Sequence, residues 1–200
     1  MKNESPKQLT DRWATIQLDN IRERLLEAAC TSEFGLTADG LCDYRGIEIS
    51  KSLHKVSVSD TDFSYAVMRR GQLVGNFVRS RFTKSRLETN VALSFDRCDF
   101  AEANLSECWM RGVFENCSFE HTKLDAASVT NARLANCTFI GNGLRETMFS
   151  ECTFEGCSFT DCSFEEGSLV GSTFKNCRFV NVSVRDVSMN RVTGFTPTRE

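Results

Sequence analysis

The chain has 200 residues, of which 40% are hydrophobic and 26% charged, and its formal net charge is −3 at pH 7. This length is enough for one domain with a hydrophobic core, and the charge argues against a general nucleic-acid-binding protein, which would normally be basic. Because no apolar stretch approaches the roughly 20 residues of a membrane-spanning helix and residues 1–6 begin no signal peptide, we expect a cytoplasmic protein with reduced thiols, no membrane association and no direct contact with nucleic acid.

Residues 1–52 do not follow the pattern of the rest, and we expect an N-terminal helical cap or extension there. Thr10 followed by Asp11 predicts a helix start, because a hydroxyl oxygen caps free backbone N–H groups and a carboxylate favours the first turn. Gly35 is the predicted stop. Between them lies an apolar stripe at helical spacing, formed by Ala14, Leu18, Ile21, Leu25 and Ala28. We expect this helix to cover the end of the repeat region that follows; a docking helix for a partner is the alternative.

The rest of the chain repeats with a period of five residues. From Phe114 to Met189 every fifth residue is apolar, and the residue two positions earlier is nearly always small. A period of five matches neither the 3.6 of a helix nor the 2.0 of a strand, so the chain must turn once in each repeat. The tripeptide Cys117-Ser118-Phe119 recurs in similar form every twenty residues. Four repeats therefore make one square coil, and like residues of successive coils stack.

The inward positions form columns along the solenoid. With a few four-residue steps the pattern extends back to residue 53, so that residues 53–192 form the predicted solenoid and residues 193–200 a tail. One column consists only of phenylalanine: Phe63, Phe82, Phe100, Phe119, Phe139, Phe159 and Phe179. The other columns combine Phe, Leu, Val and Met and begin at Val58, Met68 and Leu73. The small inward positions include Cys117, Cys137, Cys157 and Cys177, which we expect to be free thiols in a dry core.

These repeats resemble the pentapeptide-repeat family, whose usual pattern is Ala-Asp/Asn-Leu-x-x. The resemblance covers roughly residues 53–192 and departs from the usual pattern in having Cys more often than Ala and Phe more often than Leu, as in Asn116-Cys117-Ser118-Phe119-Glu120. It implies an all-β solenoid, a right-handed quadrilateral β-helix of about seven coils, here with an N-terminal α-helical cap.

The inward positions offer no group for catalysis, because they are apolar or small, whereas an enzyme needs acids, bases or nucleophiles that converge in a pocket. His54 and His121 are isolated, and the cysteines from Cys98 onward lack the Cys-x2-Cys spacing of zinc sites. We therefore expect no catalytic residue, no metal site and no cofactor.

Function is therefore expected on the outward positions. Between Phe95 and Gly171 the net charge is −8, whereas residues 53–94 carry +4 and residues 172–192 carry +3; solubility alone can account for such charges. Trp109 is an outward interface anchor if Met110 is the inward residue, and lies in the core if the register shifts by one residue. The candidate partner-binding residues are Trp109, Glu107, Asp125, Glu146, Glu165 and Glu166.

The leading hypothesis is a non-enzymatic protein-binding rod, either an adaptor or an immunity protein for self-protection that holds a partner such as a toxin. The resemblance implies an alternative, because the family includes proteins that imitate duplex DNA and thereby protect or inhibit DNA gyrase or another topoisomerase. The mild net charge weakens this alternative, and so does the spread of the acids over several faces. One face does collect Glu107, Asp125, Glu146, Glu165 and Asp186.

The C-terminal end of the solenoid lacks the sequence of a capping helix. An uncovered end would leave apolar residues exposed, namely Val182, Val184, Val187, Met189 and Phe195. We therefore predict a homodimer that forms through this end.

Overall fold

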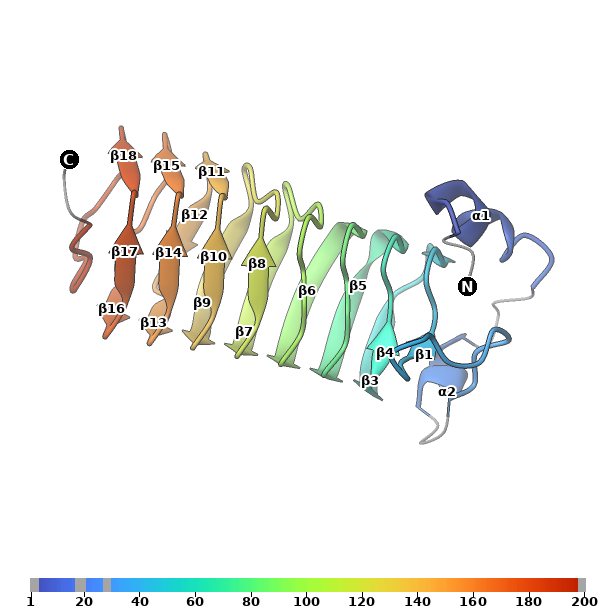
Figure 1. Cartoon of the computed structure of the whole chain (residues 1–200). Helices are drawn as coiled ribbons and strands as arrows, with labels where there is room; N and C mark the ends of the chain where they lie inside the picture. The colour runs from blue at the N-terminus through green and yellow to red at the C-terminus, as the bar shows by residue number, and fades with distance from the viewer. Residues whose placement is uncertain (1–3, 17–20, 27–29, 198–200) are drawn as a thin grey trace.

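The chain folds as an all-parallel β-solenoid of about seven turns, preceded by two short helices (Figure 1). This computed structural model describes residues 4–16, 21–26 and 30–197. The helices are α1 (Pro6–Asp11) and α2 (Ile21–Leu25), and neither of these described helices is long and apolar enough to cross a membrane. The strands are β1 (Cys42–Asp43), β2 (Glu48–Ile49), β3 (Leu53–Ser59), β4 (Thr61–Asp62), β5 (Val67–Val78), β6 (Arg86–Asp96), β7 (Trp109–Glu115), β8 (Ser118–Glu120), β9 (Ser128–Ala135), β10 (Thr138–Ile140), β11 (Gly143–Arg145), β12 (Met148–Ser150), β13 (Thr153–Glu155), β14 (Ser158–Thr160), β15 (Ser163–Glu165), β16 (Thr173–Lys175), β17 (Arg178–Val180) and β18 (Ser183–Arg185).

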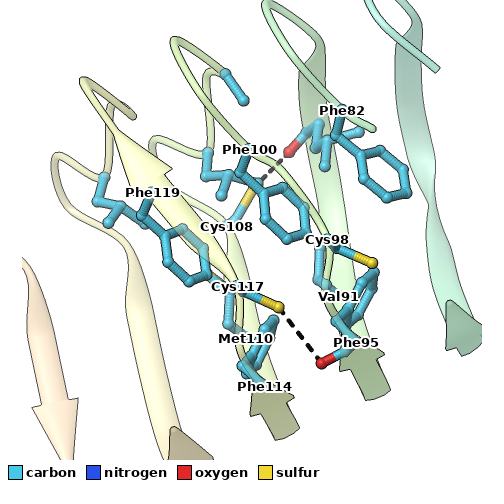
Figure 2. Close-up of a cluster of buried hydrophobic side chains, with 14 of the residues drawn as sticks. Phe82, Val91, Phe95, Cys98, Phe100, Cys108, Met110, Phe114, Cys117 and Phe119 are labelled. Atoms are coloured by element: carbon cyan, nitrogen blue, oxygen red, sulfur yellow. Dashed lines mark hydrogen bonds between the residues drawn. The ribbon is translucent and has the colours of Figure 1, made fainter. Parts of the chain in front are cut away.

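The predicted all-phenylalanine column is present. Strands β8, β10, β14 and β17 pair in a register that aligns Phe119, Phe139, Phe159 and Phe179. Along the whole column, which begins at Phe63, neighbouring rings are nearly parallel and their centroids lie 4.7–5.3 Å apart. Figure 2 shows the middle of this stack next to a second column. The rings therefore form one continuous hydrophobic spine.

The long strands β5, β6, β7 and β9 carry two further columns around one corner. Their pairing aligns Leu73, Val91, Met110 and Val129 in one column, and Phe77, Phe95, Phe114 and Leu134 in the next. The register shifts between Arg69 and Gln72 and again between Met110 and Gly112. At these two points a coil with a four-residue step meets one with a five-residue step, as the sequence pattern requires.

Most corners of the coils are turned by a residue with a positive φ, two positions after the inward residue; the exceptions are corners that the long strands β5 and β6 pass through. Asn116 (φ 55°), Glu146 (φ 56°) and Asp186 (φ 54°) are examples. This left-handed conformation costs a non-glycine residue roughly 1–2 kcal/mol. Because the cost recurs at corner after corner, the buried columns and the hydrogen bonds between coils must offset it.

The small inward positions hold free thiols and small polar residues that make the same hydrogen bond. Cys117 Sγ donates to the carbonyl oxygen of Phe95 at 3.4 Å (Figure 2), and Thr122 Oγ1 donates to that of Phe100 at 2.7 Å. Asn142, Thr147 and Ser172 bond in the same way to a carbonyl of the preceding coil. Thiol, hydroxyl and amide are interchangeable here because the acceptor is always a backbone carbonyl.

The cysteines from Cys98 onward are free, as predicted, and all except Cys177 are buried. Burial raises the pKa of Cys152 to about 11, which keeps this thiol protonated. Our prediction places Cys177 and Phe179 in the core, but both are only partly buried. The reason is that the last coil has no further coil above it.

The predicted helix start at Thr10 is wrong. α1 begins at Pro6, with Ser5 as its N-cap and a reciprocal bond between Ser5 and Gln8, and Thr10 lies inside the helix. A proline at the first helical position and this capping box define an earlier start than the hydroxyl of Thr10. The apolar stripe is divided: Ile21 and Leu25 are buried on α2, whereas Ala14 is exposed, and Leu18 and Ala28 lie outside the described residues. Because α2 ends at Leu25, Gly35 is not its stop.

The N-terminal segment covers the first coil, as predicted. Trp13 stacks on Tyr44 with 5.7 Å between ring centroids, and its Nε1 donates to the carbonyl oxygen of Arg45 at 2.8 Å. α1 lies so close to the coil that a Cβ on Gly46 would come within 2.5 Å of the backbone of Leu9. Tyr44 in turn lies 5.8 Å from Phe63 between ring centroids, so Tyr44 and Trp13 cover the first ring of the phenylalanine column.

Cys30 and Cys42 form a disulfide, so the expectation of reduced thiols is wrong for this pair. Both lie outside the predicted repeats, whose cysteines are free. Cys42 begins β1, which pairs with β4, so the paired coils reach back to residue 42, before the boundary expected at residue 53. The cytoplasmic location stays a prediction.

The C-terminal end is partly covered. The ring of Phe195 packs against Phe174 and Phe179 at centroid distances of 5.0 and 4.9 Å. The prediction that Phe195 stays open to a second copy is therefore wrong, because the tail folds over its own last coil. Val184 and Met189 remain exposed, and a homodimer through them stays a prediction.

Candidate partner-binding surface

Trp109 points outward. Met110, its neighbour at the start of β7, is buried, so alternation along the strand places the indole in solvent, where it is 62% exposed. The register aligns Trp109 with Ser128 and Ser128 with Met148, which is 44% exposed. Two large apolar side chains therefore stand in one outward row, two coils apart.

The face around this row is flat and poor in charge. We call it the Trp109 face and define it by the outward residues on both sides of the inward column from Met110 to Leu169: Trp109, Arg111, Ser128, Thr130, Met148, Ser150, Ser168 and Val170. Arg111 is the one charged residue among them. Such a face presents an apolar ridge surrounded by small hydroxyl side chains.

The predicted acidic residues lie beside the Trp109 face, in two adjacent rows. We call them the acidic corner: Glu107, Asp125, Glu146, Glu165, Glu166 and Asp186. Glu107, Glu146, Glu166 and Asp186 turn corners with positive φ, whereas Asp125 and Glu165 precede such corners. Position in the coil thus explains why residues far apart in the sequence share one edge.

Arginines neutralise the C-terminal part of the acidic corner. Arg145 Nη2 lies 3.4 Å from a carboxylate oxygen of Glu146 and 3.5 Å from one of Glu166, and Arg185 Nη2 lies 2.7 Å from one of Glu165. A hydrogen bond from Ser163 and the charge of Arg185 lower the pKa of Glu165 below its ordinary value.

Acids without an ion pair among the described residues lie on both sides of the neutralised part of the acidic corner, Asp186 at its C-terminal end and two others on the side of Trp109. Glu107 and Asp125 make no ion pair with any residue that the structure describes, and both lie at the N-terminal part of the acidic corner. Other acids between Phe95 and Gly171 also form ion pairs: Arg133 contacts both Glu115 (2.6 Å) and Glu155 (3.0 Å). The solenoid is therefore not a uniformly acidic rod.

The two histidines, His54 and His121, lie apart in the described part of the chain. His121 is exposed, its nearest carboxylate is Glu120 at 3.9 Å, and its ring lies over Gly141 of the next coil. The backbone oxygen of His54 accepts from Arg22 Nε at 2.9 Å. Within residues 4–16, 21–26 and 30–197, no group of three His, Cys, Asp or Glu side chains converges to hold a metal ion.

Two features of the surface escaped the sequence analysis. The first is Met148, an apolar residue at an outward position where the repeats usually carry serine or threonine; this departure from the pattern could have identified it in the sequence. The second is the cluster around Asp43, whose carboxylate accepts from Arg12 and Arg45. Burial alone would raise the pKa of Asp43, but hydrogen bonds from Arg45 and Arg12 lower it to about 2.

Comparison with known proteins supports the repeat assignment. A family model described as a pentapeptide repeat region matches residues 113–189. No curated protein matches the chain in sequence. Among solved structures, a variant of QnrB1, a plasmid-mediated fluoroquinolone resistance protein, is similar with 15% identity and a TM-score of 0.44 over 73% of this chain and 82% of that one. HetL, a pentapeptide repeat protein involved in heterocyst differentiation regulation in the cyanobacterium Nostoc, has 13% identity and a TM-score of 0.36 over 76% and 86%. Rfr23 from the cyanobacterium Cyanothece has 9% identity and a TM-score of 0.26 over 74% and 87%.

Proposed function

We propose that this chain, whose residues 113–189 are a pentapeptide repeat region, is a non-enzymatic rod that binds a protein partner on the Trp109 face. The observation that carries the proposal is a 62% exposed Trp109 on a flat, charge-poor face. Tryptophan is costly to leave in water and is enriched among the residues that dominate binding energy. Flat solenoid faces suit extended protein contacts, as an adaptor or an immunity protein would make.

The acidic corner indicates the chemistry of the partner. Glu107 and Asp125 are unpaired beside Trp109, so they favour a partner whose apolar patch is bordered by lysine or arginine. Glu165 and Glu166 contribute less, because Arg185 and Arg145 already contact them.

The test uses quantitative pull-down from a lysate of the source cells with wild-type protein and three variants. Trp109→Ala and Met148→Ser remove the apolar ridge, whereas Met189→Ser is the control, since Met189 is 39% exposed at the other end of the rod. We expect a partner that wild-type protein and M189S retain and W109A loses, with affinity lower by a factor of about 30, as for a binding hot spot. Equal capture by W109A and M189S would refute the proposal.

The alternative is an imitation of duplex DNA that binds gyrase or another topoisomerase. It draws on the acidic excess between Phe95 and Gly171, and it ranks second because arginines are interleaved with many of these acids. A gyrase supercoiling assay, with and without a fluoroquinolone, distinguishes the two. Inhibition or protection that the double variant Glu107→Gln/Asp125→Asn abolishes would support the alternative; no effect of wild-type protein would remove it.

A further inference from the structure

A cavity of about 450 Å³ lies at the N-terminal end of the solenoid, far from the Trp109 face. Its lining includes Leu25 at the end of α2, Leu26 just after it, Leu36 of the following loop, Tyr44 of the first coil and residues 57–61. This volume is within the range of ligand-binding sites. Leu36 is 60% and Leu26 43% exposed, so large apolar side chains border an open space.

The cavity lies where the β-ladder stops. The nine-stranded sheet runs from β16 to β2, and both β2 and β3 pair with β5, β3 along Leu73–Val78 and on one side only. On the other side α2 packs against β3, and Arg22 Nε donates to the carbonyl oxygen of His54 at 2.9 Å. α2 therefore covers the first half of β3, whereas residues 57–59 face the cavity.

The backbone of Ser57 is directed into this space. Register places Ser57 in the same row as Asn76 and, along the ladder, as Thr173 and Thr193. Thr193 donates its N–H to Ser172 at 3.1 Å and accepts from the N–H of Phe174 at 2.9 Å, both in the coil before it. Ser57 has no such coil before it, and no described residue supplies these partners.

The charged groups of the cavity are already neutralised. Asp60 pairs with Arg79 at 2.6 Å, and Arg24 pairs with Glu33 at 3.0 Å. A charged ligand would have to break these pairs, whereas an uncharged apolar segment would not. The Cys30–Cys42 disulfide ties the loop that carries Leu36 to β1, so the apolar wall is held in place.

We propose that this edge binds an extended, uncharged apolar peptide segment of a partner protein, which continues the ladder in parallel to β3. The segment accepts the N–H of Ser57 and donates one N–H to the carbonyl oxygen of Ser57, while an apolar side chain enters the space beside Val58 and Tyr44. Main-chain bonds supply affinity and the cavity supplies selectivity, as in other cases of strand addition. This site is separate from the Trp109 face and does not depend on it.

The probe is a fluorescein-labelled peptide, acetyl-Leu-Val-Gly-Asn-Phe-Val-amide, which copies residues 73–78, the uncharged segment of β5 that pairs with the opposite edge of β3. In the proposed register the N–H of its Phe points to Ser57 and the N–H of the following Val points to solvent. We therefore compare two peptides, N-methylated at Phe or at that Val, by fluorescence anisotropy with the full chain. We expect saturable binding below about 1 mM, at least about tenfold weaker for N-methyl-Phe than for N-methyl-Val, the loss that about 1.4 kcal/mol produces.

Protein variants locate the binding. Leu36→Ser changes an exposed side chain, so it leaves the fold intact by circular dichroism and weakens the peptide several-fold, whereas Trp109→Ala leaves peptide affinity unchanged. Equal affinity for the two methylated peptides, absence of saturable binding, or loss of binding in W109A would each overturn the proposal. A dimer in light scattering that L36S converts to a monomer would also overturn it, because a second copy of the chain would then occupy the edge.

Discussion

The sixth of the seven rings in the phenylalanine column, Phe159, tests how the fold is stabilised. Phe159 is fully buried and lies parallel to Phe139 at 4.7 Å and to Phe179 at 5.3 Å. Phe159→Ala leaves a ring-sized space, and the ladder holds the backbones of β10 and β17 apart on both sides, so the site cannot collapse. We expect a loss of about 3–5 kcal/mol in the free energy of unfolding, at the full cost of a phenylalanine cavity.

Two further variants make the comparison quantitative. Phe159→Leu keeps much of the volume and costs less than about 1.5 kcal/mol, and Phe179→Ala costs less than F159A because Phe179 is only partly buried in the last coil. Denaturant unfolding gives the free energies, and hydrogen exchange of β10, β14 and β17 shows where stability is lost, since each coil contacts only its neighbours. A loss below about 1 kcal/mol for F159A, or equal losses for F159A and F179A, would refute the reasoning.

Three other predictions concern charge, space and thiol access. The folded pKa of Asp43 is about 2, below its ordinary 3.8, so the charged carboxylate stabilises the fold above about pH 4. This contribution, on the order of 1–2 kcal/mol, is lost as the pH falls toward 2. Asp43→Asn should therefore flatten the pH dependence of the unfolding free energy between pH 4 and 2, and an unchanged profile would contradict the assignment. Gly167→Ala places a Cβ 2.4 Å from the carbonyl oxygen of Thr147 and should lower the free energy of unfolding by about 1–3 kcal/mol. In the control Gly143→Ala the new Cβ meets no atom within 4 Å, so its stability should be nearly unchanged. Similar melting temperatures for the two variants would contradict the close contact between Gly167 and Thr147. A thiol reagent should modify the half-buried Cys177 before the other cysteines of the repeat in native protein, and the buried ones only on unfolding, as followed by mass spectrometry; modification of several thiols in native protein would contradict a dry core.

The repeated part of the molecule was predictable from the sequence. In the regular part of the repeat an inward residue, such as Phe139, pairs with the residue twenty positions before it and the one twenty positions after it. The requirement that like inward residues stack in successive coils therefore recurs many times along the sequence. A period of five residues with a second period of twenty is enough to predict the register of the strands. The orientation of Trp109 stayed open between two registers in the sequence, and the structure decides it by burying Met110.

The parts that occur once were decided by tertiary structure. The start of α1 depends on the bond between Ser5 and Gln8, the Cys30–Cys42 disulfide on the path of one loop, and the cover of the last coil on where Phe195 folds. Ion pairing at the acidic corner depends on which side chains of neighbouring coils reach each other, as Arg185 reaches Glu165. A period cannot encode contacts that happen only once, because no second copy in the sequence repeats the signal; three-dimensional packing alone selects them.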